Sequence, residues 1–143
     1  MRVLGLDVGE RRIGVALSDP EGRIALGLTV VERKGEEAAL KQLAALAREH
    51  LVERIVVGLP RSLDGSLGRQ AQAVQDFVNA LTAYCDVPVV TWDERFSTVA
   101  ADKMLTEAGM KGAKRKARRD STAAAFILEG YLDHEKSGSV GAG

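Results

Sequence analysis

The chain has 143 residues, 45% of them apolar, which suits one domain with a substantial core and leaves too little length for two. Twenty basic residues balance twenty acidic ones, and this formal charge of zero excludes a strong overall attraction to polyanions or acidic membranes. A single cysteine, Cys85, excludes an internal disulfide. Without a signal-like start or a long apolar span, we expect a soluble cytoplasmic protein with no membrane partner.

Three short apolar runs separated by polar turns open the chain. The pattern predicts a buried strand over residues 2–8, a second strand over 13–17 and a third that ends near Val31. The intervening turns lie at 10–12 and 19–22. Strands joined by such tight turns form an antiparallel meander.

The rest of the chain alternates between helical and strand patterns. The expected elements are a helix over 36–50, a strand over 55–58, a helix over 70–83, a strand over 87–92, a helix over 96–108 and a last helix from Asp120. The order βββαβαβα predicts an α/β fold, with a mixed five-stranded sheet, the first strand central and helices on both faces. We expect one domain over residues 1–136 and a flexible tail at 137–143.

Asp7 is the most informative residue of the first strand, because the segment from Val3 to Val8 is otherwise apolar. A carboxylate in a buried strand is costly unless it is paired, hydrogen-bonded or bound to a cation. A purely structural explanation is that Asp7 accepts hydrogen bonds from turn amides near Gly9. Asp7 is therefore the first candidate for a functional site.

Two further acids are expected at the same edge of the sheet. Glu94 follows the fifth predicted strand, and Asp120 starts the final helix. Carboxyl ends of parallel strands form a natural crevice, where three carboxylates repel one another unless a cation bridges them. Oxygen ligands without histidine or cysteine favour Mg²⁺ or Mn²⁺, which can drive phosphodiester hydrolysis. We expect Asp7, Glu94 and Asp120 to be both catalytic and metal-binding, although Asp120 alone could cap its helix and Glu94 could pair with Arg95.

A basic stretch lies directly before Asp120. Six of the nine residues from 111 to 119 are Lys or Arg, and without them 14 basic residues face 20 acidic ones. A charge run is often a solvated loop, but beside a metal site it fits the binding of nucleic-acid phosphates. The expected phosphate-binding residues are Arg12, Arg61, Arg95, Lys114, Arg115, Lys116, Arg118 and Arg119, with Arg69 extending the same track.

Four blocks of the sequence resemble a known family over nearly the whole chain. They are LGLDVGERRIGVALSD, VVGLPRSLDGS, TWDERFST and RRDSTAAAFIL, and they follow one another as in the YqgF-type, or RuvX, nucleases. This family is related to Holliday-junction resolvases, and the resemblance implies a ribonuclease-H-like fold and trimming of the 5′ side of precursor 16S rRNA.

The resemblance also implies roles for individual residues. It supports Asp7, Glu94 and Asp120 as the catalytic acids and adds Thr98 as a nucleic-acid-binding position that could also cap the third helix. Resolvases of the related type carry a further acid one turn along the last helix, where this chain has Ser121, Thr122 and Ala123. A second metal ion would then depend on water, substrate phosphate or backbone oxygen.

Three other interpretations stay open. The first is a resolvase of branched DNA, which needs a symmetric dimer, although we expect a monomer or a weak homodimer. The second is a phosphotransferase of the sugar-kinase and actin type, whose first phosphate loop is similar to the first block, although this chain is long enough for only one of the two lobes. The third is a non-catalytic RNA-binding regulatory module, in which the acids are structural.

Overall fold

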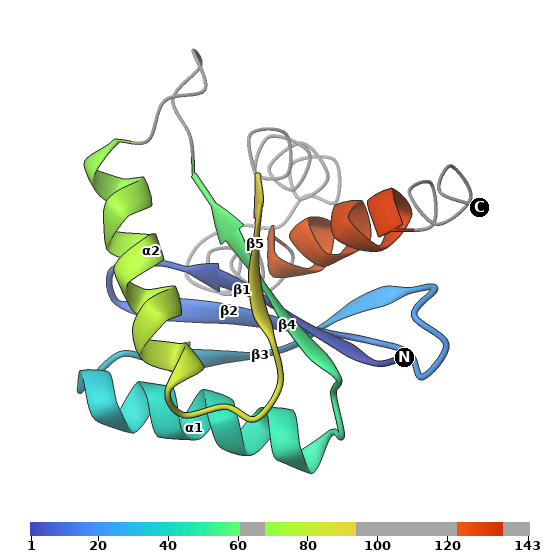
Figure 1. The fold of residues 1–143 in the computed structure, drawn as a ribbon, viewed down its shortest axis with the longest axis horizontal. Helices are drawn as coiled ribbons and strands as arrows, with labels where there is room; N and C mark the ends of the chain where they lie inside the picture. The colour runs from blue at the N-terminus through green and yellow to red at the C-terminus, as the bar shows by residue number, and fades with distance from the viewer. Residues whose placement is uncertain (61–67, 94–122, 136–143) are drawn as a thin grey trace, which may run out of the picture.

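The computed structural model describes residues 1–60, 68–93 and 123–135. The strands in these parts of the chain form one mixed sheet in the order β3-β2-β1-β4-β5 (Figure 1). The strands are β1 (Val3–Val8), β2 (Arg12–Ser18), β3 (Ala25–Glu32), β4 (Arg54–Leu59) and β5 (Val89–Asp93). β1 pairs antiparallel with β2 and parallel with β4, and β5 lies parallel to β4. The central strand is therefore the one that carries Asp7.

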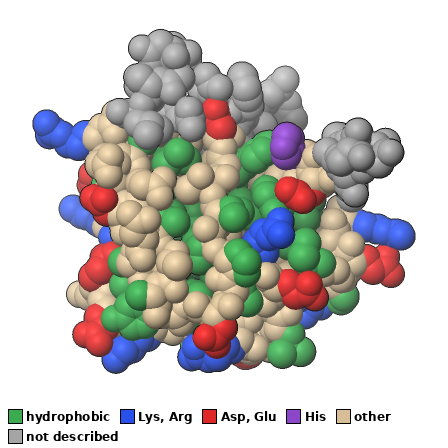
Figure 2. All heavy atoms as spheres, viewed as in Figure 1, with side chains coloured by type: hydrophobic (Ala, Val, Ile, Leu, Met, Phe, Trp, Pro, Cys, Tyr) green, Lys and Arg blue, Asp and Glu red, His purple; other side chains and the backbone are tan. Residues whose placement is uncertain are grey.

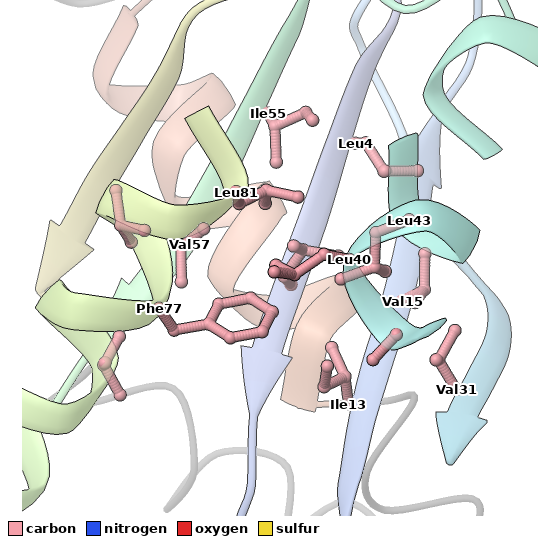
Figure 3. Packing of buried hydrophobic residues seen from close by; sticks show 14 of the residues in the cluster. Leu4, Ile13, Val15, Val31, Leu40, Leu43, Ile55, Val57, Phe77 and Leu81 are labelled. Carbon is pink, nitrogen blue, oxygen red and sulfur yellow. The ribbon is translucent and has the colours of Figure 1, made fainter. Parts of the chain in front are cut away.

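Two helices cover one face of the sheet. Helix α1 (Glu36–Glu49) and helix α2 (Arg69–Thr82) each present an apolar stripe to it. Leu4 and Leu6 of β1 belong to the larger buried cluster, together with Leu43 of α1 and Phe77 of α2. Figure 3 shows Leu4, Leu43 and Phe77 within this cluster. Alternate residues of a strand point to opposite faces, so the even positions of β1 belong to this side.

The helix of residues 123–135 covers the other face, as Figure 1 shows at the C-terminal end of the described chain. Its residues Ala124, Ile127 and Leu128 are fully buried against Val3 and neighbouring strand residues. At Gly5 the contact is so close that a Cβ would lie 2.8 Å from Leu128 Cβ and 3.2 Å from Ala124 O. Glycine is required here by the close approach of helix and strand.

The predicted sheet, its central first strand and the helices on both faces are confirmed. The fifth strand begins at Val89 rather than at residue 87, because Pro88 has no N–H for the sheet; its carbonyl still accepts a hydrogen bond from Ile55 N at 2.9 Å. The other described elements begin and end within one residue of the predicted bounds, apart from the last helix. The predicted helix over 96–108, the start of the last helix at Asp120 and the tail at 137–143 lie outside the described residues.

Candidate active site

Asp7 lies near the carboxyl end of the central strand, where it is half-buried. It stands opposite Gly14 of β2, which contributes no side chain beside it. Strand alternation places Asp7 on the same face as Val3 and Gly5, the face covered by the last helix. Asp7 also takes part in an interaction with another group of the protein.

Arg12 belongs to the same face of the sheet. It opens β2 two positions before Gly14, so its side chain lies diagonally from Asp7 across the strand pair. The connecting turn is closed by a hydrogen bond from Gly9 N to Arg12 O at 2.8 Å. A Cβ at residue 9 would lie 2.8 Å from that same oxygen, so this tight turn needs glycine. The structure thus places one predicted phosphate-binding residue, Arg12, on the face of Asp7.

The last helix runs antiparallel to β1 and begins toward Asp7. Ala124 and Leu128 contact the middle of β1 at Gly5, whereas Leu132, two turns after Ala124, lies near Gly22, which itself approaches Met1. Arg54, at the start of β4, donates a hydrogen bond to Tyr131 Oη and lies 3.8 Å from Glu135. The C-terminal end of the helix therefore lies at the amino edge of the sheet, and its start, at residue 123, lies nearer the carboxyl edge.

Strand β5 ends at the same edge. Val57 of β4 pairs with Leu6 on one side and with Thr91 on the other. Asp7 is one residue beyond this row and Asp93 is two residues beyond it, both at the carboxyl ends of their strands. Asp93 pairs with Leu59 of the larger cluster, so its half-buried side chain faces the α1 and α2 side.

The remaining predicted site residues lie outside the described parts of the chain. They are Glu94 and Asp120 among the acids, and Arg61, Arg95, Thr98, Lys114, Arg115, Lys116, Arg118 and Arg119 among the nucleic-acid-binding residues. Within residues 1–60, 68–93 and 123–135 there is no group of three or more metal-ligating side chains. Asp7 nevertheless supplies the kind of oxygen ligand that Mg²⁺ and Mn²⁺ prefer.

A cavity of about 540 Å³ lies at the carboxyl edge, on the α1 and α2 side of the sheet. It is lined by Val8 at the end of β1, by Gly9 and Glu10 of the following turn, by Arg33, and by Arg69, Gln70, Ala73 and Val74 of α2. Sequence reasoning missed Arg33, which belongs to no motif. Arg69 extends the predicted phosphate track, and the structure places it on this cavity rather than on the face of Asp7.

Cys85 is the one cysteine of the chain. Burial raises the pKa of the Cys85 thiol, and Asp86 adds to the rise while Arg48 opposes it, so a thiolate nucleophile is disfavoured. None of the helices in the described ranges has the length and apolar character needed to cross a membrane. On the face shown in Figure 2, the described acidic and basic side chains are interspersed.

Comparison with known proteins identifies the family. Residues 1–134 match the family model described as "RuvX: Holliday junction resolvase". A Clostridium kluyveri protein named "Putative pre-16S rRNA nuclease" is 48% identical over 133 residues, covering 93% of this chain and 97% of that protein. A Desulforamulus reducens protein of the same name is 50% identical with the same coverage. The structure of Thermus thermophilus RuvC in complex with a Holliday junction substrate has a TM-score of 0.57 at 19% identity, covering 96% of each chain.

The sheet order and the likeness to RuvC define the class as a ribonuclease-H-like fold, with Asp7 on its central strand. Within that class, the chain belongs to the RuvX family of nucleases, since the family model spans nearly the whole sequence. The resemblance drawn from the four sequence blocks is confirmed.

Proposed function

We propose that this protein is a divalent-metal-dependent endonuclease that processes the 5′ end of precursor 16S rRNA. The position of Asp7 carries the proposal. Its half-buried side chain is on the central strand, at the edge of the sheet where β5 ends and near which the last helix starts. Relatives that are 48% and 50% identical over 93% of the chain bear the name "Putative pre-16S rRNA nuclease", which supports the choice of substrate. The proposed substrate also favours the cytoplasm as the compartment.

In this proposal Asp7, Glu94 and Asp120 hold the metal. Glu94 directly follows Asp93, the last residue of β5, in the sequence. Asp120 lies three positions before residue 123, the first described residue of the last helix, in the sequence. Carboxylate oxygens suit Mg²⁺ or Mn²⁺, and such an ion supplies water activation and neutralises charge on the phosphate.

The protein's own residues contribute position and charge. β1 holds Asp7 rigidly, because the strand is hydrogen-bonded to neighbours on both sides and packed on both faces. Arg12 lies diagonally across the strand pair, where a guanidinium can pair with a substrate phosphate. The basic residues from 111 to 119 would bind the flanking backbone without reading base sequence.

A second candidate substrate is branched DNA, because the matching family model is described as a Holliday junction resolvase. Cutting a junction symmetrically needs two active sites related by a two-fold axis. A monomer or a weak homodimer fits cleavage of one RNA strand better. The substrate and the oligomeric state can therefore be tested together.

The deciding experiment incubates the purified protein with precursor 16S rRNA, single-stranded RNA and a four-way DNA junction, each with Mg²⁺, Mn²⁺ or EDTA. We expect cleavage near the 5′ end of the mature sequence, dependence on metal, and a rate at least about tenfold above that of the other substrates. Preferential cleavage of the junction by a dimer would favour the resolvase. Binding that survives in EDTA, with no cleavage of any substrate in Mn²⁺, would favour the non-catalytic module.

A further inference from the structure

We propose that Arg33 is a positioning residue that fixes the turn between Asp7 and Arg12, an inference that rests on the nuclease function proposed above. Arg33 lies between β3 and α1, 26 positions after Asp7 in the sequence, and its side chain is only 21% exposed. It belongs to the α1 and α2 side of the sheet, opposite the face of Asp7. Its effect on the site would therefore pass through the backbone of the turn.

The guanidinium of Arg33 contacts three separate segments. Nη1 donates to the carbonyl of Gly9 at 2.7 Å, and Nη2 donates to Glu36 Oε2 at 2.8 Å. The Cζ atom lies 5.1 Å from the centre of the Phe77 ring, which is buried in α2. In addition, the backbone N–H of Arg33 donates to Arg11 O at 2.9 Å. One residue thus ties the turn to the start of α1 and to the buried side of α2.

The geometry requires arginine. A guanidinium is planar, carries five N–H donors in a fixed fork and can stack on an aromatic ring at the same time. A lysine ammonium is a compact charge on a flexible stem, and it cannot reach Gly9 and Glu36 while covering Phe77 in the same way. Because Gly9 accepts a charge-assisted hydrogen bond, this contact is stronger than one between neutral groups.

The cavity leaves the turn between β1 and β2 without apolar packing on one side, so the contacts of Arg33 matter for its position. It lies between the turn residues and the first turns of α2, so apolar packing does not fill that space. The Gly9 N–H bond to Arg12 O closes the turn internally but does not fix it relative to the helices. The Arg33 side chain spans from the turn to Phe77. The turn joins β1, directly after Asp7, to β2, which starts with Arg12, so a shift of the turn moves both candidate site residues.

The test compares Arg33→Lys with two other variants. Arg23→Lys is the matched control, because Arg23 pairs with Glu21 on the surface at 3.1 Å and the two side chains are 72% and 65% exposed. Glu36→Gln removes the charge of one partner of Arg33 while leaving Gly9 and Phe77. For Arg33→Lys we expect kcat to fall by about 10- to 100-fold, because a misplaced site loses rate steeply. The KM for RNA should change by less than about twofold, which separates positioning from substrate binding.

Amide hydrogen exchange gives a readout that does not depend on cleavage. In Arg33→Lys, exchange at the Gly9 amide should become at least about tenfold faster, while the Leu6 amide in the centre of β1 stays protected. Arg23→Lys should match the wild type in both measurements, and Glu36→Gln should show a smaller effect than Arg33→Lys.

Four outcomes would contradict either the role of Arg33 or the proposed nuclease function. If amide exchange at Gly9 is unchanged in Arg33→Lys, the Arg33 side chain does not restrain the turn. Faster exchange with wild-type kcat would overturn the positioning role. A loss of activity that follows only the unfolded fraction in thermal melts would also overturn it. If the wild type itself cleaves nothing, the proposed nuclease function fails, and the exchange measurement alone decides whether Arg33 holds the turn.

Discussion

The two ends of the central sheet use the same residue types in different ways. At the amino end, Asp19 closes a turn by accepting the backbone N–H groups of Arg23 and Ile24 at 2.6 and 2.9 Å. At the carboxyl end, Asp7 occupies a strand position opposite Gly14. It is half-buried, on the face of the sheet that the last helix covers. The difference shows that burial and strand position, rather than residue type, distinguish the proposed catalytic acid from a structural one.

The amino end is closed by contacts among its own residues. Val3 N donates to Ser18 Oγ at 2.7 Å, and the N-terminal ammonium of Met1 donates to Pro20 O at 2.8 Å. Arg54 joins the same end of the sheet to Tyr131 on the last helix. The carboxyl end instead carries Asp7 and Arg12 on one face of the sheet and Asp93 on the other, at the ends of three strands. We therefore expect substitutions at the two ends to affect different properties.

The largest expected effect follows from Asp7→Asn. The amide keeps the shape of the side chain but removes the charge that holds a divalent ion, so cleavage of precursor 16S rRNA should fall at least about 1000-fold. RNA affinity, measured by filter binding, should change little because phosphate contacts dominate it. Asp19→Asn makes the same chemical change at the opposite end and serves as the control. Cleavage by Asp7→Asn at near the wild-type rate would remove Asp7 from the catalytic assignment.

Gly5→Ala should produce the largest loss of stability among these changes. The added Cβ would lie 2.8 Å from Leu128 Cβ and 3.2 Å from Ala124 O, so the last helix must shift. Overpacking of this kind costs about 1–3 kcal/mol in the free energy of unfolding, which urea denaturation measures. At Gly35, where no atom lies within 4 Å of an added Cβ, alanine should cost less than about 1 kcal/mol. Equal stability of the two variants would contradict the close packing of helix and strand.

Some of the structural features behind these predictions could be predicted from the sequence, and others could not. The strand order and both packed faces were predictable, because apolar runs and helical spacing report burial directly. Asp7 was identifiable because it interrupts such a run. Arg33 was not, since a charged residue between a strand and a helix is ordinary and its partners Gly9 and Phe77 lie 24 and 44 positions away in the sequence. The close approach at Gly5 likewise depends on Leu128, which local pattern cannot reveal.

Metal binding should stabilise the carboxyl end selectively. At ten times its dissociation constant, an ion that binds only the folded state adds about 1.4 kcal/mol to the free energy of unfolding. We expect Mn²⁺ to raise the Tm of the wild type in calorimetry and to leave the Tm of Asp7→Asn nearly unchanged. Asp19→Asn should respond as the wild type does. An equal rise in wild type and Asp7→Asn would show that the ion binds elsewhere.

The smallest expected effect concerns Asp19 and pH. Hydrogen bonds from backbone amides, chiefly that of Ile24, lower the pKa of the Asp19 carboxyl below its ordinary value of 3.8. A carboxyl with a lowered pKa in the folded state contributes stability above its unfolded pKa, and that contribution is lost as the pH falls through the folded pKa. The difference in Tm between the wild type and Asp19→Asn should therefore be present at neutral pH and should shrink below about pH 4. A constant difference in Tm at every pH would mean that the charge of Asp19 does not strengthen the turn. Independently of pH, the wild type and Asp19→Asn should have the same catalytic activity.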